Sequence, residues 1–286
     1  MDKYDPSRYF TVTLNSSDTS NANNKICHFE TVLPRPRMLE GEWLVGLSEI
    51  QYSRSWFNIP EDQIIGITDS KGKETECPQK VEKGFYENVE LVCEAINNAI
   101  KSAKGNLISK YAKHGDITIR PPHVTPIPRS RAVNVIHGIT PEHGKLYLRL
   151  SKDLEGMLGL QPLTTAYEVD NTVSTANVDI YTDIIKGQNG AYQCYDLNRG
   201  IHSIFVYCNL IVPSYVGNSF AKLLRVVPVQ NKKFGDQCSQ VYPKPYFYPL
   251  LCNALHKIEV ELKDHTGTFI PFEFGEATIV LEFMRQ

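Results

Sequence analysis

The sequence has few of the features that mark membrane or secreted proteins. Within its 286 residues no stretch approaches the roughly 18 to 20 consecutive apolar residues of a membrane helix, and the longest apolar run, residues 204–212, has the length of a strand. The first ten residues show no cationic segment followed by an apolar one. We therefore expect no membrane insertion, no signal peptide, and synthesis inside a cell.

An excess of charge of one sign is also lacking. A formal net charge of −2 produces no summed field that attracts a polyanion, so we expect no specific nucleic acid partner. The stretch Tyr242–Pro249 has aromatic rings to stack unpaired bases, but only Lys244 lies within it, and such a groove needs a track of cations. A packing loop or a protein contact is the better interpretation.

The pattern of cysteines and histidines does not favour a metal site. The seven cysteines contain no CxxC pair, and the eight histidines are scattered singly. This pattern favours reduced thiols that act as small core residues over disulfides or zinc ligands. Lone histidines are more often surface or hydrogen-bonded residues than ligands. We expect no metal and no cofactor.

The usual catalytic motifs are missing as well. Segment 138–145 resembles a phosphate loop, but it has one residue too many between its glycines, and Leu146 stands where Ser or Thr would bind magnesium. Glu259, Glu261 and Lys263 fall on one side of a strand, which is typical of a solvated outer face rather than of carboxylates placed across a substrate. We expect no catalytic residues and no enzyme.

The sequence does contain the two-residue period of half-buried strands. Trp43 and Leu47 share one face, whereas Ile50 and Tyr52 continue on the opposite parity, which predicts a β-bulge near Ser48. Alternation also marks segments 10–14, 64–69, 117–120, 145–150, 201–212, 223–229, 257–263 and 277–284. The side chains expected to seal the core are Trp43, Ile258, Val260, Leu262, Ile279, Leu281 and Phe283.

One segment has the period of an amphipathic helix. Apolar residues recur at i, i+3, i+4, i+7 and i+11 from Val89 to Ile100, Asn88 is placed to cap the start, and Gly105 follows. We expect a helix over about residues 88–104, laid over the sheets, and a shorter helical turn after Ser151.

These patterns predict an all-β fold, a single antiparallel jelly-roll β-sandwich with Greek-key connections, elaborated loops and one amphipathic helix. Two such sandwiches do not fit easily into this length, so we expect one domain over residues 1–286. Prolines remove donors that a central strand needs, which predicts a long loop at about 121–144. A second, polar loop is expected at about 161–200.

Several strings, taken in order, resemble a known family. They are LEGEWLVGLSEIQY (39–52), GFYENV (84–89), FVYCN (205–209), VGN (216–218), LLRVVPV (223–229), IEVELKDHTG (258–267) and PFEFG (271–275). Over about residues 9–285 the chain resembles the minor capsid, or penton, protein of Polinton (Maverick) elements and of related virophages and adintovirus-like viruses. It departs from the family at Asn209 and His265, where acids are more common.

The resemblance implies a structural protein of the virion. It implies a homopentamer that plugs the five-fold vertices of an icosahedral capsid, beside a double jelly-roll major capsid protein. A ring closes when one side of each subunit fits a different patch on the next. Because aromatic residues and Arg are enriched in such contacts, the expected subunit-contact residues are Tyr242, Tyr246, Phe247, Tyr248, Arg129 and Arg131.

Three alternatives stay open. One is a carbohydrate- or receptor-binding jelly roll, although Trp43 falls on an apolar strand face and is expected in the core. Another is a major capsid, or hexon-like, subunit. The third is a cupin-type enzyme, which would need two or three histidines and an acid to converge on a metal. Bound transition metal would favour the enzyme.

Overall fold

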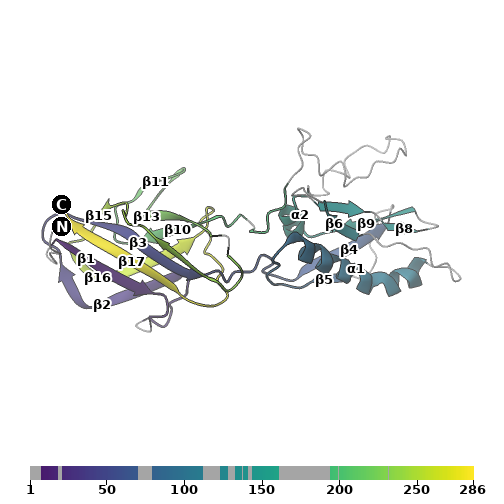
Figure 1. Cartoon of the computed structure of the whole chain (residues 1–286), viewed down its shortest axis with the longest axis horizontal. Coiled ribbons are helices and arrows are strands. Elements are labelled where there is room, and N and C mark those ends of the chain that lie inside the picture. Colours follow the sequence, from purple (N-terminus) through teal and green to yellow (C-terminus); the bar gives the residue numbers. More distant parts are fainter. Residues whose placement is uncertain are drawn as a thin grey trace. The chain divides into compact units, whose positions relative to one another are not determined.

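The chain divides into two compact units in a computed structural model (Figure 1). The structure describes residues 8–18, 21–69, 79–111, 123–127, 133–136, 138–140, 144–160, 194–198, 200–230 and 232–286. Unit 1 consists of Met1–Trp56 and Ile201–Gln286, and unit 2 of Phe57–Gly200. Where the sequence predicted one domain with elaborated loops, unit 2 therefore forms an insertion into the chain of unit 1, with a hydrophobic cluster of its own.

Unit 1 is built from eight main strands in two antiparallel sheets. The first sheet has the order β1-β17-β3-β14 and the second β13-β10-β16-β2. Their bounds are β1 Tyr9–Asn15, β2 His28–Met38, β3 Trp43–Ser53, β10 Ser203–Cys208, β13 Leu223–Pro228, β14 Gln237–Val241, β16 Ala254–Lys263 and β17 Ala277–Arg285. The chain crosses between the sheets in the order of a jelly roll, which confirms the predicted fold class.

The sandwich core lies between the two sheets, where alternate side chains of each strand meet. In β16 and β17 the alternation is nearly complete, with buried and half-buried residues following one another. The seven side chains expected to seal the core are all buried in one cluster. The predicted bulge near Ser48 is present, because the register of β17 against β3 shifts between Val280 and Leu281, and Ser48 Oγ donates to Val280 O at 3.1 Å.

Three short strands complete unit 1. The strands β11 (Ser214–Val216) and β12 (Ser219–Ala221) form a hairpin that pairs with neither sheet. The strand β15 (Tyr248–Pro249) pairs with the start of β3. The proline-rich stretch around β15 is otherwise without regular structure, as expected of prolines at a sheet edge.

Unit 2 combines a long helix with short strands. Its elements are β4 Gln63–Asp69, β5 Gln79–Val81, α1 Val89–Tyr111, β6 His123–Pro126, β7 Val133–Ile136, β8 Gly138–Thr140, β9 Gly144–Arg149 and α2 Lys152–Leu158. The strands form one sheet of order β5-β4-β9-β8 and a β6-β7 pair, and α1 contacts β5 and β6. Residues of α1, α2 and these strands make up the core of the unit.

The predicted helix is present but longer than expected. Asn88 Oδ1 accepts from Leu91 N at 2.9 Å, so the predicted cap forms, and Ser151 likewise caps α2. The helix was expected to end before Gly105, yet α1 continues to Tyr111. It was expected over the sandwich sheets but belongs to unit 2, where it contacts β5 and β6. The loop expected at 121–144 contains β6, β7 and β8, whereas segment 117–120 and most of the loop expected at 161–200 lie outside the described residues.

Candidate interaction surface

Exposed apolar side chains gather at one end of the sandwich. At this end β2, β10, β14 and β17 finish, and β3, β13 and β16 begin. Its exposed large apolar residues are Met38, Val212, Tyr215, Phe220, Val241, Tyr246 and Leu251. We call this region the hairpin end, because the β11–β12 hairpin projects from it (Figure 1). Clustered apolar residues at a surface are typical of a contact with another protein.

An arginine packed between two tyrosines forms the most ordered part of the hairpin end. Arg225 of β13 places its Cζ 3.5 Å from the ring centroid of Tyr242 and 4.3 Å from that of Tyr246. Cation–π contacts of this kind hold both rings in place. Gly46 of β3 permits the arrangement, because a Cβ there would come within 2.7 Å of Tyr246 O and 2.8 Å of Pro245 Cβ. We call these residues the Arg225 cluster.

Two polar atoms in the Arg225 cluster are buried without a hydrogen bond. Within the described part of the chain, Arg225 Nη1 and Tyr242 OH have no hydrogen-bond partner. Burial raises the pKa of Tyr242, and the nearby positive charge of Arg225 partly offsets this increase. Buried polar atoms without partners cost stability.

The structure separates the residues that the sequence predicted as subunit contacts. Tyr246 is 64% exposed, whereas Tyr242, Phe247 and Tyr248 are half-buried, and two of these pack against the sandwich core. Tyr246 is therefore the member with most surface to offer a partner. Arg129 and Arg131 lie outside the described residues.

The sequence reasoning missed the aromatic pair of the hairpin. Tyr215 and Phe220 face each other across β11 and β12, with ring centroids 5.3 Å apart and edge-to-face geometry. They are 88% and 64% exposed. A signal was present, since Gly217-Asn218 between two aromatic-containing triplets is a two-residue hairpin turn, and Gly217 has a φ of +60°.

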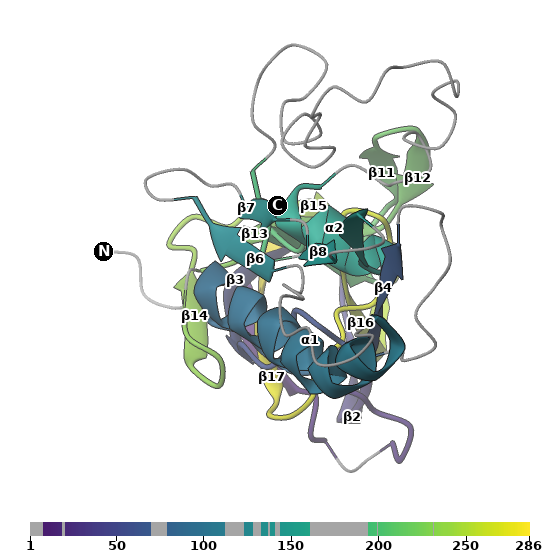
Figure 2. The same cartoon turned by 90° about the vertical axis from the view of Figure 1, so that its right-hand side faces the viewer.

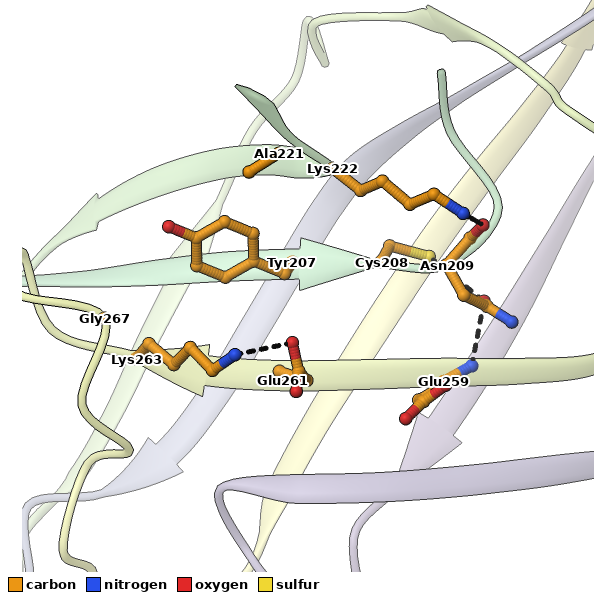
Figure 3. Close-up of a pocket in the computed structure, with 9 residues that line it drawn as sticks. All are labelled: Tyr207, Cys208, Asn209, Ala221, Lys222, Glu259, Glu261, Lys263 and Gly267. Atoms are coloured by element: carbon orange, nitrogen blue, oxygen red, sulfur yellow. Dashed lines mark hydrogen bonds and ion pairs between the residues drawn. The ribbon is translucent and has the colours of Figure 1, made fainter. Parts of the chain in front are cut away.

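A polar hollow of about 450 Å³ lies on the outer face of the second sheet (Figure 3). Asn209 organises one side of it, because Lys222 Nζ donates to Asn209 O at 2.9 Å and Glu259 N donates to Asn209 Oδ1 at 3.0 Å. On the other side Lys263 and Glu261 form an ion pair of 2.8 Å. The hollow is lined by Tyr207, Cys208, Asn209, Ala221, Lys222, Glu259, Glu261, Lys263 and Gly267.

The chemistry of this hollow is that of a solvated outer face. Its lysines are already engaged by a carbonyl and a carboxylate, and Glu259 also accepts from His28 Nε2 at 2.8 Å. Among the described residues no group of three or more His, Cys, Asp and Glu is placed to hold a metal ion. Neither described helix has the length and apolarity needed to cross a membrane. The six cysteines of the described ranges are free thiols.

Comparison with known proteins gives a likeness among solved structures but none among sequences. No protein-family model and no curated protein sequence matches the chain. Among solved structures the chain is similar to the crystal structure of the selenomethionine-labelled mavirus penton protein, with a TM-score of 0.48 and 11% sequence identity. The likeness covers 96% of this chain and 99% of that chain. At this identity and TM-score the likeness carries no inference about the function of this chain.

Proposed function

We propose that the chain is a minor capsid, or penton, protein that forms homopentamers at the five-fold vertices of an icosahedral capsid. One observation carries the proposal, namely a single jelly roll whose exposed aromatic residues gather at its hairpin end. Jelly rolls of eight strands are common in viral capsid proteins. The ordered strings from Leu39 to Gly275 that resemble Polinton and virophage pentons support the same reading.

The proposed role is mechanical. Each subunit contacts the next through different patches, the ring closes after five copies, and the ring fits beside a double jelly-roll major capsid protein in the virion. Permanent contacts of this kind bury about 2,000 Å² or more and are rich in aromatic residues and Arg. Tyr246 and the Arg225 that stacks on it fit that composition.

The main rival within the same class is a major capsid subunit. A double jelly-roll protein needs a second sandwich of eight strands. The described strands of unit 2 instead form one four-stranded sheet and one two-stranded sheet, with α1 packed against them. This arrangement favours one sandwich with an inserted unit, and thus the penton role.

The mass of the purified protein in solution tests the proposal. A ring of five has an expected mass of about 162 kDa, five times the 32.4 kDa of one chain. We expect mass photometry to give this species for the wild type, with the major capsid protein added if required. Arg225→Ala removes the cation between Tyr242 and Tyr246 and should shift the population to smaller species. Lys244→Ala, in the loop that carries the two tyrosines, should not. A strict monomer that ignores the shell protein would refute the proposal.

A second candidate function has one observation in its favour. Tyr207 lies in the outer-face hollow beside Asn209, Glu259 and Glu261, and an aromatic ring flanked by polar groups suits a sugar (Figure 3). Glycan binding by a monomer that is lost in Tyr207→Ala would support a carbohydrate-binding module. Glycan binding by the five-membered ring would be compatible with a penton.

A further inference from the structure

The four edges of the sandwich are not protected equally. The edges are β1 and β14 in one sheet and β2 and β13 in the other. An edge strand presents unpaired N–H and C=O groups, and proteins usually shield them with prolines, bulges, charges or side-chain caps. Among the described residues, three of the four edges carry such protection, whereas the middle of β1 does not.

The edge of β2 is capped by the turn that precedes it. His28 exchanges both backbone hydrogen bonds with Lys25, at 3.1 Å and 2.9 Å. The Asn24 amide does the same for Glu30, donating to Glu30 O at 3.0 Å and accepting from Glu30 N at 2.9 Å. Farther along, two residues of β2 have no N–H to offer, Pro34 and Pro36.

The two edges on the other side of the sandwich are protected in other ways. In β14, Gln230 Nε2 donates to Ser239 O at 2.7 Å, which occupies an outward carbonyl. β13 has only six residues, its register against β10 is irregular, and it ends on Pro228. Short length, irregular pairing and proline each make a strand a poor template for another chain.

In the described part of the chain the edge of β1 is capped only at its carboxyl end, where Asp18 N donates to Asn15 O at 3.1 Å. Ser16 N donates to Ala277 O and Arg285 N donates to Arg8 O, both at 2.9 Å, in one continuous register, so even-numbered residues of β1 pair with β17. The odd-numbered residues therefore direct their backbone groups outward. Thr11 and Thr13 are exposed, and within the described structure these two residues have no hydrogen bond on that side. The sequence of β1, YFTVTLN, contains no proline and no charge.

The β11–β12 hairpin is the second feature that presents outward backbone groups. Among the strands that the structure describes, its two strands pair only with each other. In a hairpin closed by a two-residue turn the residues next to the turn form a hydrogen-bonded pair, so the next pair, Tyr215 and Phe220, directs its N–H and C=O groups outward. The hairpin thus offers a short free strand edge together with two exposed aromatic rings.

We propose that the β11–β12 hairpin of one subunit adds to the β1 edge of the neighbouring copy and extends its sheet. The inference rests on the proposed ring and names the contact that builds it. The two features lie on different sides of the sandwich, since β1 lies beside β2 and the hairpin leads directly into β13 (Figures 1 and 2). A contact between different patches is heterologous and gives a ring when the rotation closes, whereas pairing of two β1 edges would give a two-fold dimer. Strand addition supplies affinity through main-chain hydrogen bonds, and the hairpin aromatics supply buried area.

Site-specific crosslinking tests the contact directly. The variant Tyr215→p-benzoylphenylalanine is irradiated as the assembled full-length protein, and crosslinked peptides are identified by mass spectrometry. We expect a bond between two chains that maps to the peptide containing Thr11 and Thr13. A crosslink that maps elsewhere, or no crosslink between chains, would overturn the inference.

Proline at an outward position provides the second test. Thr13→Pro removes an N–H that makes no bond to β17, so the subunit should fold with an unchanged melting temperature, but association should weaken about tenfold or more. Thr13→Ala keeps the N–H and should assemble like the wild type. Equal assembly of both variants would overturn the inference. If Thr13→Pro fails to fold, the double variant Tyr215→Ala with Phe220→Ala, which alters only exposed side chains, must show the same weakening.

The outcomes separate this inference from the proposed function. A wild-type ring of about 162 kDa with a crosslink outside β1 would leave the function standing and remove only the hairpin contact. A wild type that stays monomeric under all conditions would contradict both, and the mass alone would show it.

Discussion

The rings of Phe10 and Phe283 are stacked, with centroids 4.6 Å apart and planes 2° from parallel. The two residues are register partners on β1 and β17, and both belong to the buried core of the sandwich. Because β17 lies between β1 and β3, the strand that ends the sequence is central to its sheet. This position explains why the final strand is so apolar and so regular.

We expect Phe283→Ala to lower the free energy of unfolding by about 3 to 5 kcal/mol, because it removes a fully buried ring and its stacking contact with Phe10. Urea denaturation followed by circular dichroism measures the loss. Glu282→Ala, on the half-buried outer face of the same strand, should cost less than about 1 kcal/mol. Similar losses for the two variants would contradict the assignment of the core face.

Gly275 and Gly267 provide a matched pair of backbone tests. Both have positive φ, +92° and +86°, but a Cβ on Gly275 would lie 2.2 Å from Ser53 Oγ, whereas a Cβ on Gly267 would meet nothing within 4 Å. We expect both Ala variants to lose about 1 to 3 kcal/mol through backbone strain. Gly275→Ala should lose at least about 1 kcal/mol more, because Ser53 must also move. Comparison of the two urea midpoints at equal slope measures the difference, and an equal loss would show that Ser53 yields freely.

Asn97 joins α1 to β6, because its side-chain amide bonds the backbone of Val124 as a neighbouring strand would. Its amide donates to Val124 O and accepts from Val124 N, each at 2.8 Å, and Val124 is fully buried. We expect Asn97→Ala to destabilise unit 2 by about 2 to 4 kcal/mol, because two buried backbone groups lose their partners. Hydrogen exchange of α1 and β6 measures the effect. Asn98→Ala, at an exposed position of the same helix, is the control and should leave exchange unchanged.

The buried thiol of Cys208 should make the free energy of unfolding decrease at alkaline pH. Burial raises its pKa from an ordinary value of 9.0 to about 12. Between these values the unfolded chain loses the proton and the folded chain keeps it. The stabilisation is therefore fully present below about pH 9 and decreases above it, by about 1.4 kcal/mol per pH unit.

Urea denaturation at pH 8, 9 and 10 measures this slope in reducing buffer. Cys208→Ala should reduce the loss of unfolding free energy with pH by about 1.4 kcal/mol per pH unit, because one buried thiol is gone. This holds whatever the substitution does to the stability at pH 8. The same burial predicts that Cys208 reacts with iodoacetamide only after unfolding, whereas the exposed Cys194 reacts in the folded protein. An unchanged slope in Cys208→Ala would contradict the assigned pKa.

Much of the sandwich could be predicted from the sequence because its central strands alternate strictly. Ile279, Leu281 and Phe283 showed their buried face at once, and the change of parity between Leu47 and Ile50 revealed the bulge. The edge strands β2 and β14 were missed. Pro34 and Pro36 interrupt β2, and β14 is short and half polar, so neither carries a clear two-residue period.

The short strands of unit 2 were not predicted, for a different physical reason. Its strands have three to seven residues, and the buried apolar side chains that they contribute share one cluster with residues of α1. The helix gave a clear period up to Ile100, but the short strands β6 to β8 looked like a proline-rich loop. Their pairing depends on contacts such as Asn97 with Val124, which link residues 27 positions apart and leave no local pattern.

The candidate interaction surface was predictable only in part. Aromatic composition pointed to Tyr246, and the structure adds that Arg225, distant in sequence, holds it. The exposure of Tyr215 and Phe220 could not be foreseen, because exposure depends on the absence of a neighbouring strand rather than on residue type. The open backbone groups of Thr11 and Thr13 likewise become visible only when the hydrogen bonds of all four edges are compared over the described residues.

The symmetry of the assembled protein tests the central claim most directly. Negative-stain electron microscopy of the purified protein, with two-dimensional class averages of end-on views, shows how many subunits surround the axis. We predict five identical lobes in a closed ring. Isolated monomers, two-fold dimers or three-fold rings under all conditions, including in the presence of the major capsid protein, would contradict a penton role.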